Sequence, residues 1–191
     1  CFSFYDALPI SVVFGDFGVA SGEAFYRVVN SVKRDYIRTE ADELQYTLHI
    51  MLRFDLERAL MAGDLGEDDL EAAWNDRFAA DFGYDVDKPS NGCLQDVHWS
   101  VGLFGYFPTY SLGNVYSGCL HDALRQAVPD LDKDLRNGDT SRATGWLRDN
   151  VQRHGGLYAP RETIERATGH LVSEKPLMSY LRDKFSDLYD L

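Results

Sequence analysis

A long amphipathic segment does most to constrain the fold of this chain. It runs from Tyr36 to Asp64 and reads YIRTEADELQYTLHIMLRFDLERALMAGD. Thr39 and Asp42 resemble a capping box at its start, and Gly63 is a residue type that commonly ends helices. Spacings of three and four between apolar residues predict an α-helix with one buried face. These apolar residues are Ala41, Leu44, Leu48, Met51, Leu52, Leu56, Ala59 and Leu60.

Most of the remaining chain shows the same helical spacing. Further helices are predicted at 21–35, 66–83, 108–129, 139–154, 160–168 and 175–189. Ser21 or Gly22 could cap the first of them, and Gly83 and Gly169 could end two others. In the helix after Pro108, Gly113 and either Ser117 or Gly118 could permit a close contact with another helix. Alternation with a period of two, which is typical of strands, is nearly absent apart from ISVVF and YIR. We therefore expect an all-α fold with at most a minor short strand, formed by a single helical region over residues 1–191.

The charge of the chain excludes some classes of partner. A formal net charge of −12 without a cluster of Lys or Arg opposes binding to nucleic acids or to an anionic membrane surface. The apolar run ALPISVVFG is too short to cross a bilayer and lacks the flanks of a signal peptide. We expect a cytoplasmic protein that binds neither nucleic acid nor membrane. Its cysteines, Cys1, Cys93 and Cys119, should be reduced, with Cys119 in the core.

The sequence offers few self-sufficient catalytic motifs. No two of the five histidines lie three, four or five residues apart, so no helix presents a pair of them to a metal. There is also no GxSxG motif, no glycine-rich phosphate loop and no EF-hand spacing. The acids EDD at 67–69 are interpreted as favourable charges at a helix start rather than as a catalytic pair. We expect no metal site within this chain.

Aromatic rings and glycines are concentrated in residues 95–114, QDVHWSVGLFGYFPTYSLGN. His98, Tyr106 and Tyr110 could donate hydrogen bonds to a carbonyl oxygen or an oxyanion. The glycines between them could let a ligand or another part of the backbone approach closely. The pattern agrees equally well with a buried plug, in which the tyrosines bond to the backbone and His98 to a carboxylate.

Arg38 lies immediately before the predicted helix start. Its guanidinium could hold a carboxylate through two parallel hydrogen bonds. A structural ion pair with a nearby acid, such as Glu40 or Asp42, agrees better with the local pattern alone.

Two segments resemble signature regions of the carboxypeptidase Taq family of metallocarboxypeptidases. They are YIRTEADELQYTLHIMLRFDLERAL and GCLQDVHWSVGLFGYFPTYSLGN, and the family patterns read I-R-[TV]-[EA]-[AD] and G-x-x-Q-D-x-H-W. The segments EAFYRVVNSVKRDYIR, LEAAWNDRF and GWLRDNVQRHGGLYAP also resemble the C-terminal portion of that family. The resemblance therefore extends over nearly the whole chain.

The resemblance implies a helical, usually homodimeric enzyme that uses one divalent metal, typically zinc, to remove residues from the C-termini of peptides. The family binds its metal through an HExxH motif and a downstream Glu in an H-E-S-type motif, and neither occurs in these 191 residues. The metal-binding and general-base roles therefore cannot be carried over to any residue here. We expect the chain alone to bind no metal and to be inactive.

The family's residues on the side of the site opposite the metal do have counterparts in this chain. The resemblance implies that Arg38 holds the free carboxylate of the peptide, and that His98, with Tyr106 or Tyr110, stabilises the oxyanion as catalytic residues. The QDxHW motif adds three residues to the substrate-binding set, namely Gln95, Asp96 and Trp99. The alternative is a non-catalytic helical module that serves oligomerisation or scaffolding.

Overall fold

A computed structural model describes residue 18 and residues 21–191 of the chain. Over these residues the chain forms helices and connecting loops without a strand, so the predicted all-α fold is confirmed. The chain divides into two compact units. We call Ser31–Leu112 the motif unit, and Cys1–Asn30 together with Gly113–Leu191 the tail unit.

The two segments with strand-like alternation add no strand to the described part of the chain. ISVVF lies outside the described residues. YIR leads directly into a short 3-10 turn, Arg38–Glu40. Among the helices within residues 21–191, none is long and apolar enough to cross a membrane. The chain forms two compact units, and the prediction of a single helical region over 1–191 stays a prediction.

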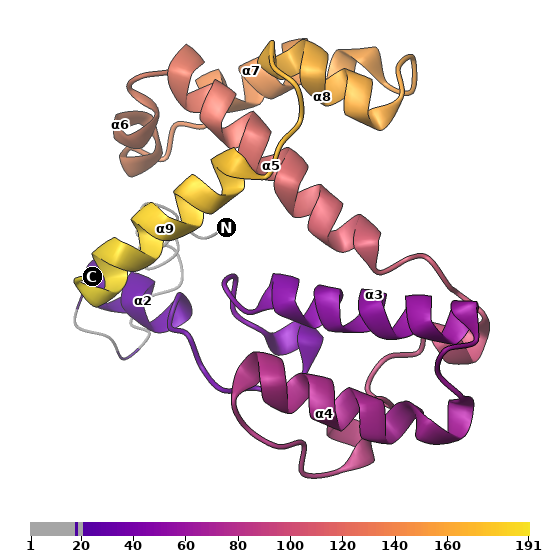
Figure 1. Ribbon diagram of the computed structural model, residues 1–191. Coiled ribbons are helices and arrows are strands. Elements are labelled where there is room, and N and C mark those ends of the chain that lie inside the picture. The colour runs from indigo at the N-terminus through magenta and orange to yellow at the C-terminus, as the bar shows by residue number, and fades with distance from the viewer. Residues whose placement is uncertain (1–17, 19–20) are drawn as a thin grey trace. The chain divides into compact units, whose positions relative to one another are not determined.

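Two helices joined by a short connection form the frame of the motif unit. Helix α3 spans Tyr46–Ala62 and helix α4 spans Leu70–Phe82, and the two lie side by side (Figure 1). Both helices end at the predicted glycines, Gly63 and Gly83, whose φ angles are 77° and 78°. Glycine carries no Cβ and adopts this left-handed conformation without the steric cost that other residues meet.

Helix α3 begins later than its sequence predicts. The side chain of Asp42 accepts hydrogen bonds from the backbone N–H groups of Leu44 and Gln45, at 3.0 and 2.9 Å. These bonds hold a turn before the helix, since a short carboxylate competes with the helix for local N–H groups. The predicted start near Thr39 was therefore wrong, and the helix begins at Tyr46.

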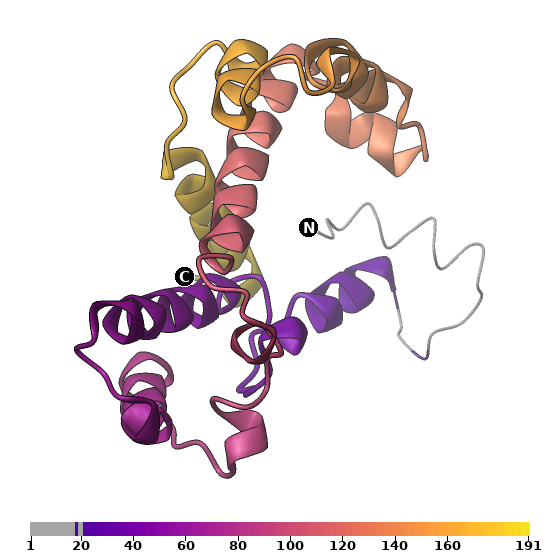
Figure 2. The same cartoon turned by 90° about the vertical axis from the view of Figure 1, so that its right-hand side faces the viewer.

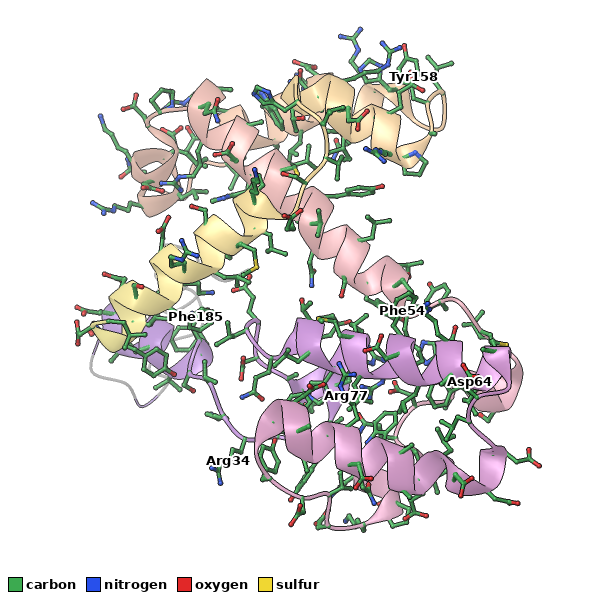
Figure 3. The ribbon with its side chains drawn as sticks, in the orientation of Figure 1. Arg34, Phe54, Asp64, Arg77, Tyr158 and Phe185 are labelled. Carbon is green, nitrogen blue, oxygen red and sulfur yellow. The ribbon has the colours of Figure 1, made fainter. Side chains whose placement is uncertain are left out.

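The core of the motif unit lies between α3 and α4. Leu52, Leu56, Trp74 and Phe78 form a buried cluster against which partly buried apolar and aromatic side chains pack. Arg77 of α4 adds a link at the edge of this core, because its Nη1 lies 2.8 Å from the Asp55 carboxylate of α3 (Figure 3). The helical spacing did not predict the 3-10 turns of this unit. One lies directly before α4, at Glu67–Asp69, and two follow it, at Pro89–Asn91 and Trp99–Val101.

In the tail unit, helix α2 spans Gly22–Val29. Ser21 caps it as predicted, because its Oγ accepts a hydrogen bond from the N–H of Ala24 at 3.1 Å. The prediction of a helix as far as residue 35 was wrong, since the side chain of Asn30 donates to the Tyr26 carbonyl at 2.8 Å and ends the helix.

Helix α5 (Pro108–Ala127) and helix α9 (Lys175–Tyr189) approach closely at Gly118 (Figure 2). A Cβ on Gly118 would lie 2.8 Å from the backbone of Leu177, so only glycine allows this contact. The prediction of a close helix contact through Gly118 is confirmed, whereas Gly113 faces open space. Cys119 is buried beside this contact, as predicted.

Shorter helices complete the tail unit. Leu124, Val128 and Leu131 form its buried cluster, against which Trp146 packs. The helices are α6 (Leu131–Arg136), α7 (Ser141–Asn150), the 3-10 turn Gln152–His154 and α8 (Pro160–Thr168). The prediction placed α8 and α9 correctly and did not include α6.

Candidate functional site

Arg38 lies at the start of the 3-10 turn before α3 and is buried, with 6% of its surface exposed. Its Nε and Nη2 donate hydrogen bonds to Oδ1 of Asp96 at 3.1 and 2.8 Å. Its Nη1 donates to the hydroxyl of Tyr46 at 3.1 Å. The expectation that a local acid, Glu40 or Asp42, pairs with this arginine was therefore wrong, because its partner comes from the QDxHW segment.

Asp96 also binds a second arginine, Arg53 of α3. Arg53 is fully buried, and its Nε donates to Oδ2 of Asp96 at 2.6 Å while its Nη1 donates to the carbonyl of His49 at 2.7 Å. The sequence reading missed Arg53. One signal could have found it: His49, Arg53 and Glu57 recur every four residues on α3, and all three are buried.

Charge interactions keep these groups ionised. Burial opposes the charged form of Asp96, but hydrogen bonds and charge attraction from Arg38 and Arg53 outweigh it, so the pKa of Asp96 lies below its ordinary value. Burial lowers the pKa of Arg53 to about 10, although Asp96 opposes this effect. The pKa of Arg38 is raised despite burial, because Asp96 and Tyr46 bind its guanidinium. At neutral pH the cluster therefore holds two cations and one anion.

His98 and Tyr110 stand next to this charged cluster. Nε2 of His98 and the hydroxyl of Tyr110 lie 3.1 Å apart and share a hydrogen bond, and Nδ1 of His98 lies 3.8 Å from Oδ1 of Asp96. The ring of Tyr110 covers the guanidinium of Arg38, with 4.9 Å between the ring centroid and Cζ. Burial raises the pKa of the Tyr110 hydroxyl, so it stays protonated and can donate at neutral pH.

Tyr106 lies at the exposed side of the same group. Its ring packs edge-on against Tyr110 with centroids 5.4 Å apart, and tilted against His98 at 5.8 Å. The side chain is 42% exposed, in contrast to His98 at 9%. The structure therefore brings His98, Tyr106 and Tyr110 together and leaves Tyr106 open to solvent within the described residues.

Glu57 fixes the loop that carries these aromatic residues. One of its carboxylate oxygens accepts a hydrogen bond from the indole N–H of Trp99 at 2.9 Å, and the other accepts from the backbone N–H of Gly105. Gly102 and Gly105 have φ angles of 75° and 76°, and nothing lies within 4 Å of a Cβ at either position. Both glycines are thus needed for the turns of the loop, and neither makes a close contact with another described part of the chain. The approach of a ligand to them stays a prediction.

Gln95 joins the two segments of the site. Its Oε1 accepts a hydrogen bond from the backbone N–H of Arg38 at 2.9 Å, and its Nε2 donates to the carbonyls of Tyr36 and Asn91 at 2.9 Å. These contacts place Gln95 in a supporting position beside Arg38, whereas Trp99 is bound to Glu57. Direct contact of either side chain with a ligand stays a prediction.

The described residues do not fit a divalent metal. Within residue 18 and residues 21–191, no three His, Cys, Asp or Glu side chains gather closely enough to hold a metal ion. The carboxylate of Asp96, which faces the site, is already bound by two guanidinium groups. A catalytic zinc usually needs three protein ligands.

Comparison with known proteins supports the resemblance noted in the sequence. Residues 5–185 match the family model described as Carboxypeptidase Taq (M32) metallopeptidase. The chain is 38% identical over 177 residues to thermostable carboxypeptidase 1 of Thermus thermophilus. This match covers 93% of this chain and 35% of the relative. It is also 38% identical over 165 residues to carboxypeptidase 1 of Bacillus subtilis, covering 86% of this chain and 33% of the relative.

Solved structures agree with this. The crystal structure of an M32 carboxypeptidase from Deinococcus radiodurans matches 98% of this chain with a TM-score of 0.91 and 42% identity, over 39% of its own length. Metallocarboxypeptidase 1 of Trypanosoma cruzi matches 95% of this chain with a TM-score of 0.89 and 34% identity, over 37% of its length. The chain thus spans about a third of the length of the relatives that it matches.

Proposed function

The chain belongs to the carboxypeptidase Taq (M32) family of metallopeptidases, and on this premise we propose that it forms the substrate-binding part of an enzyme that removes residues from the C-termini of peptides. The substrate is a peptide with a free terminal carboxylate. The alternative is a helical module without a catalytic role, which would also agree with the missing HExxH and H-E-S-type motifs.

The buried guanidinium of Arg38 is the observation that carries the proposal. A guanidinium offers five N–H donors, and three of those of Arg38 bind Asp96 and Tyr46. The remaining donors, on Nη1 and Nη2, suit the two oxygens of a carboxylate. Burial strengthens such a bond, because water competes less for the charge.

His98, Tyr110 and Tyr106 supply donors for a peptide carbonyl in this proposal. The hydroxyl of Tyr110 and Nε2 of His98 are already hydrogen-bonded at 3.1 Å, and Asp96 lies near the other nitrogen of the ring. A donor held in place before the reaction stabilises negative charge on a carbonyl oxygen without reorganisation. The exposed ring of Tyr106 would contact the peptide chain.

The metal that the family name implies has no fitting site among the described residues. We propose that zinc or another divalent ion is held by residues outside this chain, where it would polarise the carbonyl and activate water. The 191 residues alone would then bind a peptide product weakly and would not hydrolyse it. We also propose a cytoplasmic homodimer for the complete enzyme.

The test of the proposed function compares one peptide with a free and with an amidated C-terminus in the complete enzyme. Arg38→Ala should weaken binding of the free acid by about 2 to 5 kcal/mol, because it removes one partner of a buried charge-assisted bond. Binding of the amide should change little. Arg77→Ala is the control, since Arg77 pairs with Asp55 and Asp81 at the edge of the α3–α4 core. Equal losses for acid and amide would exclude a carboxylate role for Arg38.

Tyr110→Phe and Tyr106→Phe test the donors. The variant that removes the donor to the carbonyl should lower turnover by roughly 100-fold to 1,000-fold with little change in ground-state affinity. Wild-type turnover in both variants would indicate that the aromatic residues serve packing only.

A further inference from the structure

We propose that Arg53 is a positioning residue that makes the site select a carboxylate over a neutral amide. Because Arg53 binds one oxygen of Asp96, this single carboxylate does not fully neutralise Arg38. An anionic ligand would neutralise the remaining positive charge, and a neutral amide would not. This inference rests on the proposed function and adds to it a residue that does not itself contact the ligand.

The charges of the cluster do not balance. Asp96 is the one carboxylate that forms an ion pair with Arg38 or Arg53 within the described residues, at 2.8 and 2.6 Å. Two guanidinium groups therefore share a single anion. Glu57, one helical turn beyond Arg53 on α3, accepts instead from the neutral donors of Trp99 and Gly105. One positive charge remains for a ligand.

Hydrogen bonds fix the orientation of Asp96. Arg53 holds Oδ2 through Nε, and the His49 carbonyl holds Nη1 of the same guanidinium. Arg53 thus cannot turn away, and Oδ1 of Asp96 is directed at Nε and Nη2 of Arg38. The remaining donors of Arg38 are consequently held in one direction, which favours a ligand with two coplanar oxygens.

Apart from Asp96, aromatic rings lie next to the two cations. Cζ of Arg53 lies 4.6 Å from the ring centroid of Trp74 and 5.5 Å from that of Phe107, and Cζ of Arg38 lies 5.8 Å from the same Phe107 ring. Rings attract a cation through their faces but do not neutralise its charge. In such surroundings the charge of Arg53 acts on a nearby anion with less screening than in water.

The experiment measures binding of N-acetyl-L-phenylalanine and of its amide to the complete enzyme by calorimetry. The unmodified enzyme should prefer the acid. Arg53→Met should reduce that preference by about tenfold, through weaker binding of the acid alone. Arg53→Lys, which restores the charge, should retain the preference within about threefold near pH 7. Arg77→Met, the control for loss of an arginine between α3 and α4, should not change it.

The outcomes separate this inference from the proposed function. An unmodified enzyme without preference for the acid contradicts the proposed role of Arg38 and with it the inference. A clear preference that survives in Arg53→Met, or equal losses for acid and amide, overturns the role of Arg53 alone. Equal loss of preference in the Met and Lys variants also overturns it, because the charge would then not be the cause.

If Arg53→Met does not fold, the role of Arg53 can be tested by measuring the preference for the acid at several pH values in Arg53→Lys. Asp96, Arg38, Tyr46 and His49 are the titratable neighbours of this position. A buried lysine loses its proton at lower pH than a guanidinium. In Arg53→Lys the preference for the acid should therefore decrease as the pH is raised from about 7 to about 9. It should stay constant in the unmodified enzyme, whose Arg53 has a pKa of about 10. A constant preference in the lysine variant overturns the proposal.

Discussion

The motif unit and the tail unit differ in where their ionisable side chains lie. In the motif unit Arg38, His49, Arg53 and Glu57 are buried. In the tail unit most ion pairs lie at the surface, as between Arg125 and Asp132, where both side chains are more than 40% exposed. The buried charge in its described part is Lys184, whose ammonium lies 3.3 Å from the hydroxyl of Tyr180.

This difference supports the proposal that the motif unit binds the ligand. Ion pairs removed from water contribute less to folding than apolar packing of the same volume, and breaking them is costly. A unit with such a cluster has a charge held in a fixed orientation, but its free energy of unfolding is lower than apolar packing would give. The tail unit instead buries an apolar cluster of Leu124, Val128 and Leu131.

The largest effect on stability is expected from Asp96→Ala. It should lower the free energy of unfolding by about 3 to 5 kcal/mol, because both arginines lose their shared anion inside the protein. Urea denaturation with hydrogen exchange should locate the loss in the motif unit. The double variant Asp96→Ala/Arg53→Met should recover part of it. If the double variant loses the sum of the single effects, the unpaired charge is not the cause.

His49 should make the stability of the motif unit depend on pH. Burial, and next the charge of Arg53, lowers the pKa of His49 to about 4, below the ordinary 6.5. Between about pH 4 and pH 6.5, His49 is therefore protonated in the unfolded chain but not in the folded chain. The contribution of a neutral His49 to the free energy of unfolding is thus fully present above about pH 6.5. It should fall by about 3 kcal/mol as the pH drops towards 4. Urea titrations of His49→Leu should lack this part of the slope; the same slope in both proteins would contradict the prediction.

Gly118→Ala tests the tail unit by packing rather than charge. The new Cβ would lie 2.8 Å from the Leu177 backbone, and we expect a loss of about 1 to 3 kcal/mol. Gly113→Ala on the same helix meets nothing within 4 Å and should stabilise by up to about 1 kcal/mol. Thermal unfolding of the two variants checks this, and a loss of equal size at Gly113 would show that the contact with α9 is not responsible.

The smallest effect is expected from Arg125→Ala. Its Nη2 lies 2.6 Å from the Asp132 carboxylate, but the pair is exposed, so we expect a change between zero and about 1 kcal/mol. Added salt should reduce even this difference. A loss as large as that of Asp96→Ala would remove the contrast between the two units.

Local patterns predicted those parts of the fold that depend on neighbouring residues. Ser21 caps α2, and Gly63, Gly83 and Gly169 end helices with positive φ. Each of these signals acts within about one helical turn and can be read without knowledge of the rest of the chain. The start of α3 was wrong because a side-chain turn at Asp42 competed successfully with the helix.

The sequence by itself also determined the family and most of the residues of the candidate site, because the motifs that contain Arg38, Asp96 and His98 can be read directly. Only the tertiary structure decided how these residues are paired. Asp96 meets Arg38 across 58 positions of the chain and Arg53 across 43. No helical period relates residues so far apart, and the pairing follows from the packing that brings the QDxHW segment against α3. The same packing buries His49, Arg53 and Glu57, which the local pattern alone did not single out.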